Sequence, residues 1–395
     1  MWFFCAFFGI GKEKIIMNQT FMKERRIFPL VLSMALPMML SMAFSSLYNI
    51  VDSYFVAKLS EDAMTALSLV FPAQNLMTSV AVGFGVGINA MIAFYLGAGQ
   101  QKKANHAAAQ GLMFSVVHGL LIMALCLIGM PAFLGAFTSK QSVVDLGAEY
   151  SDIVFLFAVI VNVGITYVKI FQSVGRMKET MICMVIGFVA NIVLDPLLIF
   201  GVGFFPQMGI RGAAVATGIG QVLTLIAYIV FDKVKPLPVR INRESLSLDG
   251  EVCGRMYGIG IPATLNMALP SVLITALNGI LSVYSESYVL VLGVYYKLQT
   301  FIYLPANGII QGIRPLVGYN YGAGENRRVE KIYRLSLGMA ALLMAAGTVA
   351  CMAVPSQLMS LFSDSTDTVS KGCTALRIIC LGFIVSSLSV TYSGT

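Results

Sequence analysis

Residues 181–204 read MICMVIGFVANIVLDPLLIFGVGF, an apolar run with one asparagine and one aspartate inside it. Its length and apolar composition are typical of a helix that crosses the roughly 30 Å hydrocarbon core of a bilayer. Asn191 and Asp195 lie one helical turn apart within it and therefore share one helix face. A carboxylate at mid-membrane costs on the order of 2.5–3.5 kcal/mol on insertion scales and normally faces a water-filled cavity. Asp195 is therefore the strongest pointer to function in the chain.

The whole chain shares this apolar character. Of its 395 residues, 57% are hydrophobic and 11% are charged, and the mean hydropathy is +0.82, well outside the range of soluble domains. Ten apolar runs are each long enough to cross a bilayer: 28–56, 63–95, 107–133, 150–171, 180–204, 209–231, 256–283, 287–317, 335–355 and 372–392. The runs are rich in Leu, Met and Ala and lack short alternating segments. They predict an all-α polytopic membrane protein rather than a β-barrel.

The basic residues are concentrated in alternate loops. The chain carries 26 Lys and Arg, of which 19 fall in one set of loops, Lys169 and Arg176 among them, and four in the opposite set. Such an excess marks the cytoplasmic side, so we expect the N-terminus and the polar linker near 232–251 to be cytoplasmic. The net charge of +7 therefore reports topology, and no nucleic-acid partner is expected.

The sequence contains an internal repeat with an offset of 225 residues. The offset superimposes Pro37 on Pro262, Gln74 on Gln299, Gly83 on Gly308, Gly87 on Gly312, and LGAGQQKK (96–103) on YGAGENRR (321–328). The repeat predicts two pseudo-symmetric lobes of six spans each, in the same orientation, related by an axis along the membrane normal.

These patterns divide the chain into four parts. We expect an N-terminal cytoplasmic extension at 1–26, an N-lobe at 27–231, a cytoplasmic linker at 232–251 and a C-lobe at 252–395. The C-lobe holds only four of the six spans that the repeat predicts. We therefore interpret the sequence as C-terminally truncated, with about ten spans present.

A second group of polar residues lies on one face of the first span. Helical spacing places Ser45, Tyr48, Asn49 and Asp52 on adjacent turns. Asp52 and Asp195 are the acidic residues that lie clearly inside spans, and both belong to the N-lobe. Two carboxylates that face one cavity can share a proton or hold a cation, because ionising both in a low dielectric is costly. We expect a proton or sodium switch.

Other polar positions have a structural reading as well as a functional one. Asp195 can serve as a hydrogen-bonding group between helices, and Asp52 can lie at the membrane interface. Membrane asparagines more often join helices than bind ligands, yet we also count Asn162 as a candidate cavity residue, alongside Asn49. Pro37 predicts a kink in the first span and is the candidate hinge.

No enzyme motif is found. The two histidines have no metal-ligand spacing, and neither a Gly-x-Ser-x-Gly motif nor a phosphate-binding Gly-x-x-x-x-Gly-Lys motif occurs. We predict a transporter without a cofactor that runs on an ion gradient or on a separate subunit.

Several short motifs together resemble one family. They are Leu36-Pro37, YNIVDS (48–53), GAG (97–99), NIVLDP (191–196), MGIRGAAVAT (208–217) and GYNYGAG (318–324). The chain resembles the multidrug and toxic compound extrusion (MATE) family, in particular its bacterial MepA-type branch. The resemblance implies twelve helices in two lobes around a V-shaped chamber. It further implies export of amphipathic organic cations across the bacterial cytoplasmic membrane in exchange for H⁺ or Na⁺, by a protein that we expect to be monomeric.

The resemblance also implies a site. Asp52 with Tyr48, the pair Asn191 and Asp195, and Thr217 match the family's first-lobe positions. By this likeness, Asp52, Asn191, Asp195 and Thr217 would bind the coupling ion, as Na⁺ ligands if the protein is sodium-coupled. A lipid-linked oligosaccharide flippase is the alternative within the same superfamily. It would need a cationic chamber, for which the spans offer Lys297 and Arg377.

Overall fold

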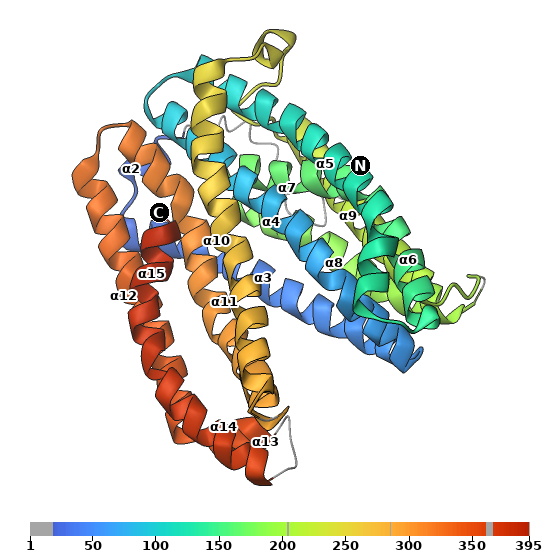
Figure 1. Ribbon diagram of the computed structural model, residues 1–395. Coiled ribbons are helices and arrows are strands. Elements are labelled where there is room, and N and C mark those ends of the chain that lie inside the picture. The colour runs from blue at the N-terminus through green and yellow to red at the C-terminus, as the bar shows by residue number, and fades with distance from the viewer. Residues whose placement is uncertain (1–18, 204, 285, 361–365, 395) are drawn as a thin grey trace.

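The computed structural model describes residues 19–203, 205–284, 286–360 and 366–394, and every regular element in these ranges is a helix (Figure 1). The predicted all-α fold is confirmed. The helices are α2 (Phe21–Glu24), α3 (Ile27–Ala57), α4 (Glu61–Gly97), α5 (Gln101–Phe137), α6 (Gln141–Leu156), α7 (Ala158–Ser173), α8 (Met177–Phe200), α9 (Ile210–Val234), the 3-10 helix η1 (Arg243–Leu246), α10 (Gly250–Ser282), α11 (Glu286–Gly322), α12 (Asn326–Ala353), α13 (Pro355–Ser360), α14 (Thr366–Ile379) and α15 (Leu381–Gly394).

Each predicted apolar run lies on a long helix or on a pair of helices. Among the described residues, α3, α4, α5, α8, α9 and α12 are long and apolar enough to cross a membrane. Two bent pairs qualify when each is counted as one span: α6 with α7, bent by 49°, and α14 with α15, bent by 48°. The fourth and tenth runs are therefore broken helices. The helices α10 and α11, although 33 and 37 residues long, are not in this set.

The helix bounds repeat with the sequence. Moving α4 by the 225-residue offset gives the bounds of α11, and the broken span recurs at the corresponding place in each half. Close contacts repeat too. A Cβ atom on Gly97 would lie 1.9 Å from the carbonyl oxygen of Tyr319. The repeat equivalents of these two residues are Gly322 and Phe94, and a Cβ atom on Gly322 would lie 2.1 Å from the carbonyl oxygen of Phe94. The prediction of two pseudo-symmetric lobes is confirmed.

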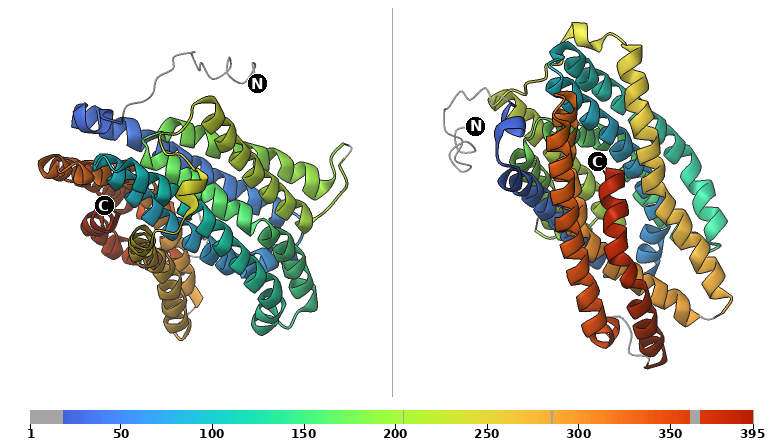
Figure 2. Two further views of the ribbon diagram at one scale, coloured as in Figure 1. Left: turned by 90° about the horizontal axis from the view of Figure 1, so that it is seen from above. Right: turned by 90° about the vertical axis from the view of Figure 1, so that its left-hand side faces the viewer.

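Small residues bring the two halves together at one end of the molecule. A Cβ atom on Gly87 of α4 would lie 2.3 Å from the carbonyl oxygen of Met256 in α10. Its repeat counterpart Gly312 of α11 meets the backbone of Ala35 in α3 in the same way, at 2.6 Å. Glycine permits this close approach between membrane helices. Figures 1 and 2 show that α10 and α11 diverge from the N-terminal half at the ends that lie away from these contacts.

Hydrogen bonds and an ion pair hold the linker against the end at which the halves meet. Arg176 donates through Nη2 to the carbonyl oxygen of Pro236 at 2.7 Å, and Gln110 donates to that of Ser247 at 2.9 Å. An ion pair of 2.8 Å joins Lys103 of α5 to Glu251 of α10. The basic loops expected on one side of the membrane therefore gather at one end of the structure.

The expected N-terminal extension is only partly described. Residues 1–18 lie outside the described part, whereas Met22 is fully buried. Its carbonyl oxygen accepts hydrogen bonds from Asn320 Nδ2 at 3.1 Å and from Arg328 Nε at 3.2 Å. The segment just before α3 is therefore docked on the C-terminal half.

The two prolines near the predicted site lie inside continuous helices. α3 continues through Pro37 without a break, so a kink at this position would be a bend within one helix. The role of Pro37 as a hinge stays a prediction. α8 likewise continues through Pro196 to Phe200. It is capped by Gly201, whose φ of 72° is a left-handed conformation that glycine adopts readily. One continuous helix therefore carries Asn191 and Asp195.

Candidate functional site

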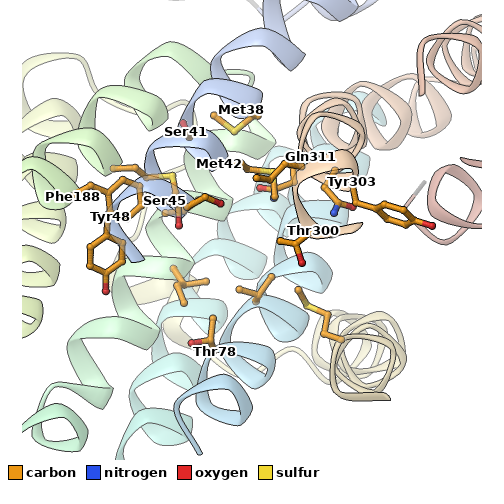
Figure 3. A pocket seen from close by; sticks show the side chains of 18 of the residues that line it. Met38, Ser41, Met42, Ser45, Tyr48, Thr78, Phe188, Thr300, Tyr303 and Gln311 are labelled. Carbon is orange, nitrogen blue, oxygen red and sulfur yellow. The ribbon is translucent and has the colours of Figure 1, made fainter. Parts of the chain in front are cut away.

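A cavity of about 1380 Å³ lies between the halves. Helices α3, α4, α7, α8 and α9 line it from the N-terminal half, and α10 and α11 line it from the other (Figure 3). Its wall is mostly apolar, with interspersed hydroxyl and amide groups such as Ser41, Thr300 and Gln311. The lining segments lie farther from the linker than the Gly87 and Gly312 contacts. The halves thus close at the linker end, and the cavity begins beyond that closure.

A polar cluster lies in the N-terminal half where α3, α8 and α9 meet. The Asp52 side chain is 7% exposed and Asp195 is fully buried. Their carboxyl groups are in hydrogen-bonding contact with each other. The second carboxyl oxygen (Oδ1) of each residue is buried and has no hydrogen-bond partner among the described residues. The structure thus brings together the two acids that the sequence placed on separate spans.

Asn191 connects this pair to α9. In the amide orientation that satisfies both neighbours, its nitrogen donates to Asp195 Oδ2 at 3.0 Å. Its oxygen accepts from Thr217 Oγ1 at 3.2 Å and from the Thr217 backbone nitrogen at 3.0 Å. Tyr48, one turn before Asp52 on α3, makes a side-chain hydrogen bond with Thr217. All five residues that the family resemblance suggested therefore form one connected cluster.

Glycines make this cluster sterically feasible. A Cβ atom on Gly187 of α8 would lie 1.9 Å from Thr224 Oγ1 and 2.7 Å from the carbonyl oxygen of Gly220 in α9. A Cβ atom on Gly220 would lie 2.8 Å from the Gly187 carbonyl oxygen. The two backbones are therefore nearly in contact. This approach brings Asn191 within hydrogen-bonding distance of Thr217.

The acids do not themselves line the large cavity, which corrects the expectation that both face it. The cluster reaches the cavity through Tyr48, Asn191 and Thr217. The Tyr48 ring stacks on Phe188 of α8, with centroids 5.4 Å apart and planes inclined by 10°. Phe188 also lines the cavity (Figure 3) and was not predicted. Its position one turn before Asn191, on the same face of α8, is the sequence signal that could have identified it.

Of the remaining predicted cavity residues, some line the cavity and others do not. Ser45 lines the cavity. Asn49 is exposed and donates to the Ser45 carbonyl oxygen at 2.8 Å within its own helix. Asn162 is buried and donates to the Ala158 carbonyl oxygen at 2.8 Å. Asn49 and Asn162 do not line the cavity, so their expected role there is corrected to a bond within the helix.

One basic residue was placed wrongly. The loop pattern assigned Lys169 to a cytoplasmic loop, but it lies inside α7, is 3% exposed and lines the cavity. Hydropathy gave only the approximate end of this span, so a basic residue near that end resembled the neighbouring loop cations. The side chain of Lys297 lies outside the described residues.

The fold and the site define a class of protein: a helical membrane transporter with two repeated lobes, a cavity between them and a buried polar cluster in one lobe. A sequence model of the MatE family matches residues 37–197 and 262–395, and the chain belongs to this family.

Two relatives are named Multidrug export protein MepA. The protein from Staphylococcus aureus (strain MSSA476) is 24% identical over 375 residues, and the one from Staphylococcus haemolyticus (strain JCSC1435) is 25% identical over 375 residues. Each alignment covers 95% of this chain and 82% of the relative.

Solved structures show the same fold. An outward-facing multidrug resistance MATE family transporter of the MOP superfamily has a TM-score of 0.89 at 25% identity, with 97% of this chain and 84% of that chain covered. A MOP superfamily transporter from Pyrococcus furiosus, described as having a binding pocket of reverse polarity that suggests a different function, gives 0.88 at 25%, with 97% and 85% covered. The comparisons support transport of the MATE kind and do not favour the flippase alternative.

Proposed function

We propose that this protein is a secondary antiporter that exports amphipathic organic cations in exchange for H⁺ or Na⁺. The observation that carries the proposal is the buried pair Asp52 and Asp195, each with a carboxyl oxygen that lacks a hydrogen-bond partner among the described residues. Two touching carboxylates cannot both stay ionised at low cost in such surroundings, so they hold either a proton or a cation between them. The names of the MepA relatives support the drug-export part.

The donor set suits either coupling ion. A proton would bind between the carboxyl groups of Asp52 and Asp195. A sodium ion would also need neutral oxygens, which the amide of Asn191 and the hydroxyl of Thr217 offer within one hydrogen-bonded cluster. The described residues contain no group of three or more His, Cys, Asp or Glu that would hold a tightly bound metal.

The cationic end of the substrate would lie against the Tyr48 and Phe188 rings. Aromatic faces attract organic cations by about 0.5–2 kcal/mol, depending on desolvation. The side chains of Tyr48, Asn191 and Thr217 would connect a substrate at this place to the acid pair. When the pair takes up an ion, its negative charge is neutralised and the attraction for the cationic substrate falls. Thermodynamic linkage then requires each ligand to weaken the binding of the other.

The cycle also needs a change of access. In the described conformation the halves meet at the linker end, and the cavity lies beyond that contact. Export requires a second conformation that opens at the linker end. We assign the linker end to the cytoplasm from the loop charges and propose Pro37 as the hinge of α3. We further propose that the protein works as a monomer in the bacterial cytoplasmic membrane.

The test is drug-evoked ion flux in proteoliposomes that contain the purified protein. Asp195→Asn removes the ionisable group and keeps the size of the side chain, so we expect coupled H⁺ or Na⁺ flux to fall at least tenfold. Asp152→Asn, which changes an exposed acid of α6, is the matched control and should transport normally. Separate proton and sodium gradients identify the ion. Normal coupled flux from Asp195→Asn would overturn the proposal.

A further inference from the structure

Lys169 is the one formally charged residue among those that line the cavity in the described part of the chain. It lies in α7 near the closed end and is 3% exposed. Gly85 of α4 makes room for it, because a Cβ atom there would lie 2.7 Å from Lys169 Cγ. The part of the cavity wall that the structure describes therefore presents a basic group and no carboxylate, which is unexpected for a chamber that binds only organic cations.

The Lys169 side-chain amine has no counter-ion among the described residues. Its Nζ donates to Gln172 Oε1 at 3.1 Å, and none of the ion pairs found in the described part involves it. The charged group that acts on it is Arg314 of α11, a second cation, whose Nε donates to the Gly394 carbonyl oxygen at 3.0 Å. An ammonium carries three donors. Two donors therefore remain for a ligand, and a buried cation is stabilised when an anion arrives.

Amide groups continue this polar region across the two halves. Gln172 Nε2 donates to Gln311 Oε1 of α11 at 3.4 Å and approaches Met38 Sδ of α3 at 3.2 Å. Gln311 and Met38 also line the cavity. The ammonium thus lies at the junction of both halves, among groups that can donate to or pack against a bound guest.

We propose that Lys169 forms an anion-binding subsite at the closed end of the cavity, which takes the carboxylate of amphipathic zwitterions. The cationic end of the same guest would lie against Tyr48 and Phe188; only this part rests on the function proposed above. The cavity, at about 1380 Å³, exceeds the roughly 300–1000 Å³ typical of small-molecule sites, so a guest that reaches both places fits. The site thus selects for substrates that carry both charges.

The test is equilibrium binding of a matched pair of dyes to the purified full chain in detergent, measured by fluorescence polarisation. One probe is a rhodamine with a free carboxylate, and the other is its ethyl ester, which keeps the cation and loses the anion. Lys169→Met should weaken binding of the acid at least tenfold and change binding of the ester less than about threefold, because only the acid presents a carboxylate that loses its buried partner. Lys169→Arg should retain tight binding of the acid.

Controls separate a site from a folding defect. Lys178→Met removes an equally basic but exposed residue of α8 and should leave both dyes unaffected. Each variant is compared with the parent protein by size-exclusion profile and melting temperature. Equal weakening of acid and ester by Lys169→Met, or unchanged binding of the acid, would overturn the proposal.

A small inorganic anion shares the same chemistry, so each titration is repeated with most of the sodium chloride replaced by sucrose at equal osmolarity. The zwitterion is supported if the acid keeps its advantage over the ester in both buffers. Chloride is the occupant instead if it strengthens ester binding and Lys169→Met removes that dependence. Because no ion gradient is involved, these results stand apart from those of the flux assay.

Discussion

At the scale of single residues, Tyr48 is the contact between the cavity and the buried acids. Its ring stacks on Phe188 and its hydroxyl bonds to Thr217, which in turn bonds to Asn191 beside Asp195. A cationic guest on the Tyr48 ring and an ion at the acids would therefore affect each other's binding through this one side chain.

Tyr48→Phe separates these two contacts. The ring and its stacking on Phe188 remain, while the bond to Thr217, worth about 0.5–1.5 kcal/mol, is lost. We expect dye affinity without the coupling ion to stay within twofold. The concentration of ion that displaces half of the dye should rise about three- to tenfold. Tyr54→Phe, on the exposed side of α3, is the matched control. An unchanged displacement curve would show that the hydroxyl plays no part in coupling.

The sequence predicted the acids better than it predicted their surroundings. Helical spacing and the rarity of membrane carboxylates were enough to select Asp52 and Asp195. Lys169 was misplaced because basic residues near span ends usually extend to the interface, and only the space above Gly85 shows that this one turns inward. Asn162 was mistaken for a cavity residue because the sequence does not show that a carbonyl of its own helix satisfies the amide.

At the scale of helices, the site depends on how closely α8 and α9 approach. Gly187 and Gly220 leave no room for a side chain between them, and Asn191 and Thr217 meet one turn farther along. The sequence shows these glycines but not their partners. It also missed the break between α6 and α7, since residue 157 is neither glycine nor proline. There the Phe157 ring packs against Gly218 of α9, a contact between distant segments that no local pattern reveals.

Gly187→Leu tests the close approach. The new side chain would meet Thr224 and the Gly220 backbone and would push α9 away, which costs about 1–3 kcal/mol. We expect the melting temperature in detergent to fall by several degrees and ion-coupled transport to be lost. Gly129→Ala in α5, where a Cβ atom has nothing within 4 Å, should leave the melting temperature unchanged or higher. Equal melting temperatures for Gly187→Leu and the parent protein would contradict the tight packing.

At the scale of the whole molecule, the internal repeat explains why one end is closed. The contacts Gly97 with Tyr319 and Gly322 with Phe94 are copies of each other, so the two lobes meet through equivalent surfaces. The offset of 225 residues in the sequence was sufficient to predict this symmetry. It did not reveal which end of the lobes would be in contact, because a repeat is compatible with closure at either end of the membrane.

The Lys103 and Glu251 ion pair reports on that closure, because it joins α5 of one lobe to α10 of the other at the linker end. Cysteines at both positions, in a background without the native cysteines, can be joined by a short reducible cross-linker. Alternating access requires this end to open, so the cross-linked protein should still bind dye but should export it at less than a tenth of the uncross-linked rate. Reduction should restore export. Cross-linking Asp62 to Lys140, whose 2.6 Å ion pair lies within the N-terminal lobe, is the matched control and should not impair export. If the protein exports normally while cross-linked at 103 and 251, the lobes do not separate at the linker end, and export must follow another route.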